Sequence, residues 1–132
     1  EKFTALLEGE FNPAAIEKQD CEILERAEEQ LRDYFEGRRR RFQIPLELNL
    51  GGFARKVLGA VARIPYGKVV TYGHVARRVG NPRACRAVGV AVGANPLPLV
   101  IPCHRVVAKS GLGGFGPGVE IKRTLLELEG AL

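Results

Sequence analysis

The chain has 132 residues and a mass of 14.4 kDa, which suits one compact domain with at most a short appendage. Hydrophobic residues make up 45% and charged residues 27%, and the mean hydropathy is −0.06. No apolar run approaches the roughly 18 residues that span a bilayer, which excludes a membrane-spanning protein, and the apolar content argues against bulk disorder. The 16 glycines follow no period, which excludes collagen.

The cysteines are too few and too far apart for a disulfide framework. They lie at positions 21, 85 and 103, no Cys-x-x-Cys pair occurs, and the chain has two histidines. We therefore expect no metal site. Free thiols favour a reducing compartment, and nothing at the start of the chain resembles a secretion signal. We expect a cytoplasmic protein, or a nuclear one if the source is a eukaryote.

The net charge of +5 is unevenly distributed along the chain. Residues 1–50 hold eight basic and twelve acidic residues, a net charge of −4, whereas residues 51–132 hold twelve basic and three acidic residues, a net charge of +9. A positive field of this kind attracts polyanions, above all nucleic acid. A basic surface that serves solubility is the alternative interpretation.

The acidic first part of the chain predicts one helix and an extended tail. Apolar residues recur at helical spacing up to Phe35, with Asn12 or Asp20 as the N-cap and Gly37 as the stop. From Phe42 to Leu50 apolar residues alternate, but a proline interrupts them, so a central strand is not expected. We place a domain boundary after residue 50, between a reduced N-terminal segment, 1–50, and a C-terminal domain, 51–132.

The second part predicts an α+β domain that is mainly helical. We expect helices over 53–64, 72–79 and 82–93, with a very short strand at 69–71. A tight turn containing Gly80 joins the last two helices, which is typical of a helix-turn-helix.

The third of these helices carries few side chains that could read base edges. Its small residues leave a flat face with one long basic side chain: Ala84, Cys85, Ala87 and Gly89, with Arg86. Such a face can approach a narrow groove closely, which favours sequence-independent DNA binding. Close packing between helices is the alternative.

Cys103 and His104 stand between two apolar stretches, 99–101 and 106–107. Nearby positive charge and a base lower the pKa of a cysteine, so Cys103 is a candidate activated thiolate. The alternative is a small hydrophobic residue of the core. On an extended chain neighbouring side chains point apart, so their adjacency in the sequence does not by itself predict a direct contact between the two side chains.

The segment Ile101-Pro-Cys-His-Arg-Val-Val107 resembles the active-site signature of the O6-alkylguanine-DNA alkyltransferases. The resemblance runs in order over about residues 53–130. Residues 64–73 resemble the approach to the family's first motif helix, and 81–89 resemble its recognition helix. Residues 95–98 resemble its asparagine hinge, and 113–115 with 122–130 resemble its closing loop and helix. The sequence departs from the family in its short N-terminal part and at Ala54, Cys85 and Gly116.

The resemblance implies a single-turnover mechanism without a cofactor. Cys103 would accept the alkyl group, and His104 would act as its base through a bridging water. Glu129 would orient His104, Tyr72 would donate a proton to guanine N3, and Lys122 would support the electrophile or the thiolate.

The resemblance also implies how DNA is held. The partner would be double-stranded DNA containing O6-alkylguanine, and also O4-alkylthymine, bound by a monomer that flips the base. Arg86 would fill the gap that the flipped base leaves. Asn95 would hold the turn before the active site, and Val106 and Gly116 would line or support the substrate site. The remaining DNA contacts would come from Thr71, Tyr72, Ala84, Cys85, Ala87 and Gly89.

Two other functions remain open from the sequence. An alkyltransferase-like damage sensor would flip the lesion without repairing it, but such proteins lack the cysteine that is present here as Cys103. A helix-turn-helix transcription regulator is disfavoured by the small residues of its third helix.

Overall fold

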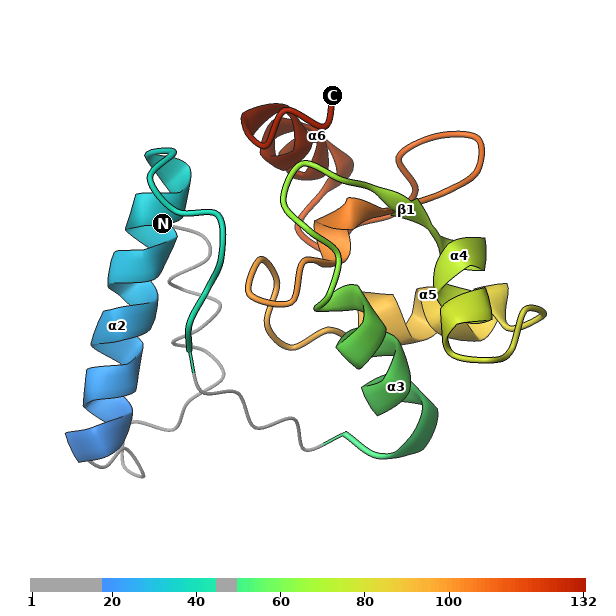
Figure 1. Cartoon of the computed structure of the whole chain (residues 1–132), viewed down its shortest axis with the longest axis horizontal. Coiled ribbons are helices and arrows are strands. Elements are labelled where there is room, and N and C mark those ends of the chain that lie inside the picture. The colour runs from blue at the N-terminus through green and yellow to red at the C-terminus, as the bar shows by residue number, and fades with distance from the viewer. Residues whose placement is uncertain (1–17, 45–49) are drawn as a thin grey trace. The chain divides into compact units, whose positions relative to one another are not determined.

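The computed structural model describes residues 18–44 and 50–132 (Figure 1). The chain divides into two compact units, residues 1–47 and 48–132, and each is described here by itself. The α+β class is confirmed, because the helices are accompanied by one two-stranded sheet. The boundary after residue 50 stays a prediction. No helix of the described ranges is long and apolar enough to cross a membrane.

Helix α2, Lys18–Phe35, belongs to the first unit. Ala27, Leu31 and Tyr34 are buried on one face, at the i, i+4 and i+7 positions that the spacing predicts. The N-cap prediction at Asn12 lies outside the described residues, and the Asp20 alternative is wrong because Asp20 lies inside the helix. Of the predicted extended tail, 45–49 also lie outside the described residues.

Gly37 ends α2 as predicted. Its φ of +78° suits a residue without a side chain, and the amides of Gly37 and Arg38 donate to the carbonyls of Tyr34 and Asp33. These two bonds form a Schellman motif, which satisfies the last carbonyls of a helix.

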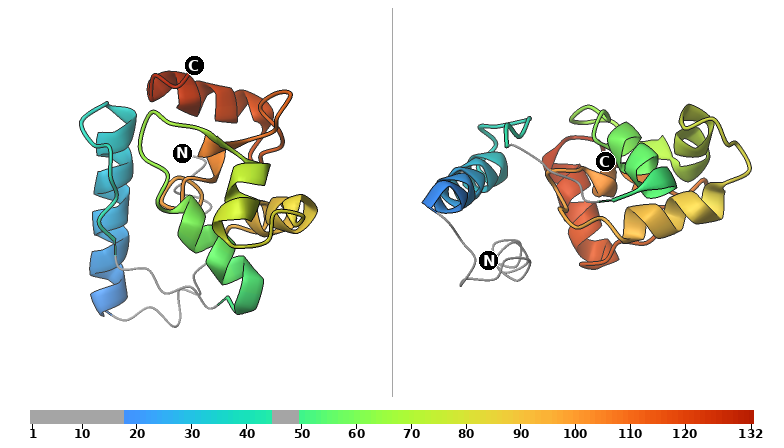
Figure 2. Two further views of the ribbon diagram at one scale, coloured as in Figure 1. Left: turned by 45° about the vertical axis from the view of Figure 1, so that its right-hand side comes forward. Right: turned by 90° about the horizontal axis from the view of Figure 1, so that it is seen from below.

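The second unit is built on three helices, as the helix-turn-helix prediction required. They are α3, Gly52–Val61; α4, Tyr72–Arg78; and α5, Cys85–Gly93. Each gives its apolar face to one core: Val57, Leu58 and Val61 from α3, Val75 and Ala76 from α4, and Val88, Ala91 and Val92 from α5. Figure 2 shows the three helices gathered together.

Two helix boundaries differ from the prediction. Helix α5 begins three residues late, because Asn81 to Ala84 close a turn in which the Ala84 amide donates to the Asn81 carbonyl at 3.0 Å. Helix α3 ends at Val61 instead of Ile64, because the amides of Arg63 and Ile64, just ahead of Pro65, donate to carbonyls three residues back.

Gly80 makes the tight turn of the helix-turn-helix. Its φ is +82°, its amide donates to the Arg77 carbonyl, and the Asn81 amide donates to the Ala76 carbonyl at 2.9 Å. This second Schellman motif fixes the direction in which α5 leaves α4.

A small parallel sheet connects this helical core to the reactive segment. Strand β1, Val70–Thr71, pairs with β2, Val106–Val107, in the register Val70 to Val106 and Thr71 to Val107. The sequence predicts β1 but not its partner. Tyr72 follows β1 directly and Cys103–Arg105 (η2) precedes β2, so the pairing brings the two together. Helix α6, Val119–Leu128, lies across the sheet from α3, α4 and α5 (Figures 1 and 2).

Candidate active site

Pro102 turns the chain into the reactive segment. Its φ and ψ of −77° and 65° are those of an inverse γ-turn, closed by the Cys103 amide on the Ile101 carbonyl at 2.7 Å. Cys103, His104 and Arg105 then form one turn of 3₁₀-helix. The expectation of extended chain here is wrong, because the fixed φ of proline starts a turn and the Arg105 amide donates back to the Pro102 carbonyl.

Cys103 is buried, with 5% of its surface exposed. Burial raises the pKa of the Cys103 thiol, although a hydrogen bond from Asn95 and the charge of Lys122 act in the opposite direction. The expectation of a net lowered pKa is therefore wrong, because desolvation outweighs the nearby positive charge. The thiol is protonated at neutral pH and needs a base.

His104 is fully buried and can be that base. Its Nε2 lies 2.7 Å from Glu129 Oε2. Burial lowers the pKa of His104, with further lowering from Arg105 and Lys122, whereas Glu129 raises it. A neutral imidazole facing a carboxylate donates its Nε2 proton to it, which leaves a lone pair on Nδ1. Nδ1 is buried and makes no hydrogen bond to any described residue.

Arg105 is the member of the site that the sequence analysis missed. It is 6% exposed, and its Nε and Nη2 donate to the two Glu129 carboxylate oxygens at 2.8 and 2.9 Å. Its Nη1 donates to the Ile64 carbonyl at 2.7 Å, and its guanidinium lies over the Tyr66 ring. A cation between apolar stretches needs a buried anion, and that signal could have revealed the pair.

Glu129 occupies its position because of how α6 ends. It is the C-cap residue, and Gly130, with a φ of +74°, closes a Schellman motif in which the amides of Gly130 and Ala131 donate to the carbonyls of Glu127 and Leu126. A carboxylate at a helix C-terminus faces the negative end of the helix dipole. The bidentate Arg105 and the Gly67 amide, 3.2 Å from Oε1, offset this.

Lys122 ties α6 to the segment after Cys103. Its Nζ donates to the carbonyls of Val106 at 2.6 Å and Gly114 at 3.1 Å. Burial lowers the pKa of Lys122 to about 8, and the charge of Cys103 raises it. Lys122 therefore keeps its proton at neutral pH, when it lowers the pKa of the thiol.

Tyr72 stands at the start of α4 and is half-buried. Burial raises its pKa, and the charge of Cys103 raises it further, so the phenol keeps its proton near the thiol. Thr71 caps the helix and accepts a hydrogen bond from the His74 amide at 3.1 Å. Gly113 packs against the Tyr72 ring, because a Cβ at Gly113 would lie 3.1 Å from the hydroxyl oxygen.

Asn95 shapes the loop between α5 and Cys103. Its Nδ2 donates to the Ile101 carbonyl at 2.9 Å, and its Oδ1 accepts from the Leu97 amide at 2.9 Å. Leu99 in this loop is buried and has a φ of +74°. This backbone conformation is energetically unfavourable for any residue that carries a side chain. The side chain of Asn95 therefore stabilises the turn that delivers Cys103.

Five of the predicted DNA-binding residues lie on α5 or at its start, whereas Thr71 and Tyr72 lie at the start of α4. Cys85, Arg86 and Ala87 are exposed, while Ala84 and Gly89 are half-buried. A Cβ at Gly89 would meet no atom within 4 Å, so the helix surface is open at that point.

Two of the other predicted residues differ in their burial. Val106 is buried in β2, whereas Gly116 is exposed in the segment before α6 and no described contact joins it to Cys103. Within 18–44 and 50–132, no group of three His, Cys, Asp or Glu side chains could hold a metal ion.

Comparison with known proteins shows the family of the chain. The family model "6-O-methylguanine DNA methyltransferase, DNA binding domain" matches residues 52–131, and these include all of the site described above. The chain belongs to this family.

Relatives within the family support the assignment. A methylated-DNA–protein-cysteine methyltransferase of Metallosphaera sedula is 52% identical over 103 residues, which are 77% of this chain and 65% of that protein. The chain thus spans just under two thirds of that alkyltransferase's length.

Solved structures of the family are also similar. Mycobacterium tuberculosis OGT in complex with DNA is 44% identical, with a TM-score of 0.79, covering 82% of this chain and 68% of that one. S. pombe Atl1 in complex with damaged DNA containing O6-carboxymethylguanine is 38% identical, with a TM-score of 0.55, covering 63% and 80%.

Proposed function

We propose that this protein repairs DNA by moving an alkyl group from guanine O6, and from thymine O4, onto Cys103. The observation that carries the proposal is the buried arrangement of Cys103, His104 and Glu129, with His104 Nδ1 unpaired among the described residues. The methyltransferase name of the Metallosphaera sedula relative supports the same reaction.

The protonation states of the site suit a neutral resting pair. The raised pKa of Cys103 keeps the thiol protonated, and the lowered pKa of His104 keeps the imidazole neutral. Such opposite pKa shifts make the thiol the proton donor and the imidazole the base. The thiol proton passes to His104 Nδ1, through one water, as the sulfur attacks. The resulting imidazolium is stabilised by Glu129.

The atoms balance in one displacement. A carbon–sulfur bond forms at Cys103 while the bond from the alkyl carbon to guanine O6 breaks. Tyr72 donates a proton to guanine N3, so the guanine leaves as a neutral base, and the tyrosinate is neutralised again from solvent. Lys122 stabilises the thiolate as it forms. The thioether has no leaving group that water can displace, so each molecule acts once and needs no cofactor.

The substrate base must leave the duplex to reach a buried cysteine. We propose that α5 enters the minor groove with its small residues and that Arg86 fills the gap left by the flipped base. The exposure of Arg86 and Ala87 supports this, as does the open surface at Gly89. We expect the protein to act in the cytoplasm or nucleus, where it meets DNA.

Incubation with free benzylguanine followed by intact-mass measurement tests the transfer. We expect one benzyl group per molecule, located at Cys103 by peptide mapping and absent from Cys103→Ala. The exposed Cys85 provides a matched control, since Cys85→Ala should still react. Modification at Cys85 with Cys103 untouched would contradict the proposal. Tight binding of damaged duplex without any transfer would favour a damage sensor instead.

The rates with two substrates test the role of Arg86. Free benzylguanine requires no flipping, so Arg86→Ala should react with it at nearly the wild-type rate. The rate of reaction with the same lesion in a duplex should fall. The matching rise in activation free energy should be at most the few kcal/mol that unstacking costs. If the two rates fall in parallel, Arg86 supports the fold or the thiol and does not fill the gap.

A further inference from the structure

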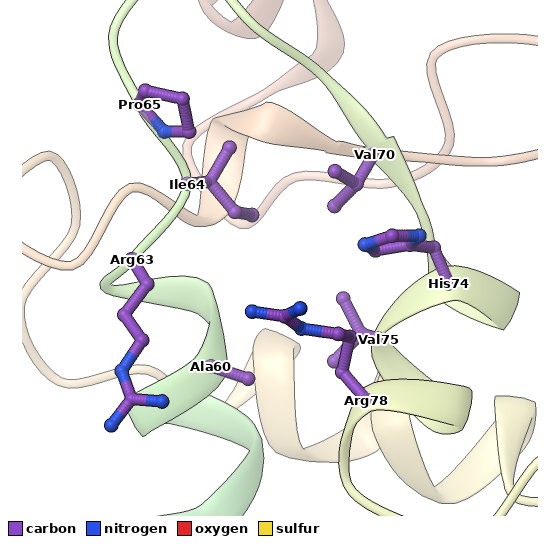
Figure 3. A pocket seen from close by; sticks show the side chains of 8 residues that line it. All are labelled: Ala60, Arg63, Ile64, Pro65, Val70, His74, Val75 and Arg78. Atoms are coloured by element: carbon purple, nitrogen blue, oxygen red, sulfur yellow. The ribbon is translucent and has the colours of Figure 1, made fainter.

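A second basic surface lies apart from the exposed face of α5. Helices α3 and α4 enclose a pocket of about 180 Å³ whose floor is apolar and whose rim carries Arg63, Arg78 and His74. Figure 3 shows the side chains of Arg78 and His74 pointing into the pocket, while Arg63 runs along α3 at its edge.

A second hollow of about 510 Å³ continues this pocket along α3. It shares Ala60, Arg63 and Arg78 with the first and adds Arg55 and Lys56. The two hollows together are called the α3–α4 groove here. Four cationic side chains therefore line it: Arg55, Lys56, Arg63 and Arg78.

Among the described residues, none pairs as an anion with these four cations. None of them forms an ion pair or side-chain hydrogen bond within the described residues, unlike Arg105, whose charge is matched by Glu129. The sequence explains why: residues 51–119 contain ten basic residues and no acidic one. Cations held close together without anions repel one another, and a phosphodiester backbone relieves that repulsion.

The groove is lined by residues other than those of α5 that we propose to bind DNA. No residue of α5 lines either hollow, and α5 turns Val88, Ala91 and Val92 toward the core. Arg86 and Ala87 on its outer face are exposed. The groove residues are therefore distinct from the α5 residues that we propose to contact the first duplex.

We propose that the α3–α4 groove binds the phosphate backbone of a second DNA duplex while α5 holds the first. The inference rests on the proposed function for the placement of the first duplex. Arg63 and Arg78 would contact phosphate oxygens through their guanidinium groups, and Arg55 and Lys56 would extend the contact along α3. A protein with two DNA surfaces bridges neighbouring duplexes, which lets it pass between them during a search for lesions.

A capture experiment tests this in the 132-residue chain. Cys103→Ala protein saturates an immobilised duplex that contains O6-benzylguanine, and a labelled undamaged duplex is then added. We expect capture of the labelled duplex. The logarithm of its association constant should fall by about 3 to 4 for each tenfold rise in salt concentration, as four phosphate contacts require.

Variants of the groove give the decisive comparison. Adding Arg63→Ser and Arg78→Ser should weaken capture at least tenfold and lower the salt slope by about 2, because two phosphate contacts are lost. The first duplex should still bind as before. The matched control is Arg123→Ser, an exposed arginine on α6 outside the groove, which should leave capture near its starting level.

Three results would overturn the proposal. These are no capture at saturation, equal capture by the groove variant, or a parallel loss of the first duplex, which would place both surfaces on one DNA molecule. The groove variant with Cys103 retained should react with free benzylguanine at the wild-type rate, which also verifies its fold. Capture does not require transfer, so failure of benzylguanine to label Cys103 would reject the proposed function separately.

Discussion

Replacing Glu129 by glutamine should destabilise the fold as well as slow the reaction. Glu129 and Arg105 are 6% exposed each, and the guanidinium makes two hydrogen bonds of 2.8 and 2.9 Å to the carboxylate. At an effective dielectric constant of 20, unit charges at that distance attract by about 6 kcal/mol. Much of this attraction is cancelled by the cost of desolvating both groups.

The Glu129→Gln variant loses the attraction between the two charges but still pays for the desolvation of Arg105. Glutamine has the shape of glutamate without its charge, so the buried Arg105 guanidinium is left without an anion. Removal of one partner from a buried pair typically costs about 3–5 kcal/mol, a large part of the roughly 5–15 kcal/mol that stabilises a domain. We expect the free energy of unfolding of Glu129→Gln to fall by that amount.

Urea unfolding followed by circular dichroism at pH 7 measures this change. Glu127→Gln is the matched control, because Glu127 is exposed on the same helix and should change stability by less than about 0.5 kcal/mol. The double variant Arg105→Met, Glu129→Gln should recover part of the loss, since it removes the uncompensated cation. A loss below about 1 kcal/mol in Glu129→Gln would refute the view of Glu129 as the counterion of a buried Arg105.

Three further outcomes follow from the site. Burial lowers the pKa of His104 from its ordinary value of 6.5, so the rate of transfer should fall on the acid side with a midpoint below pH 6.5; a midpoint above 6.5 in a stopped-flow pH series would contradict this. Gly113→Ala should slow transfer on the order of tenfold, because a left-handed backbone costs about 1–2 kcal/mol with a side chain and the new Cβ would crowd Tyr72. Gly114→Ala, whose Cβ would meet nothing within 4 Å, is its control, and equal rates for the two would contradict the argument. Asn95→Ala should lower the free energy of unfolding by about 1–3 kcal/mol, since two polar groups of the loop lose their partner, and unchanged urea unfolding would show that the loop holds itself.

Local signals in the sequence determined most of the helical frame. Helical spacing of apolar residues identified α2 and α3, and the glycines at 37 and 80 marked helix ends because glycine tolerates the left-handed backbone without strain. The Pro-Cys-His-Arg string identified the reactive segment. The late start of α5 was missed because Pro82 is equally suited to a turn and to the first position of a helix.

Only the tertiary structure decided the electrostatics of the site. Burial outweighs nearby positive charge and raises the pKa of Cys103, and no local pattern reports how deeply a side chain is buried. Arg105 and Glu129 are 24 residues apart and become a pair only because α6 ends beside η2. The pairing of β1 with β2 likewise joins two-residue strands far apart in the chain. The sequence determines which residue types are present and which segments form helices. Desolvation of a side chain and pairing between distant residues depend on which segments pack against one another in the fold.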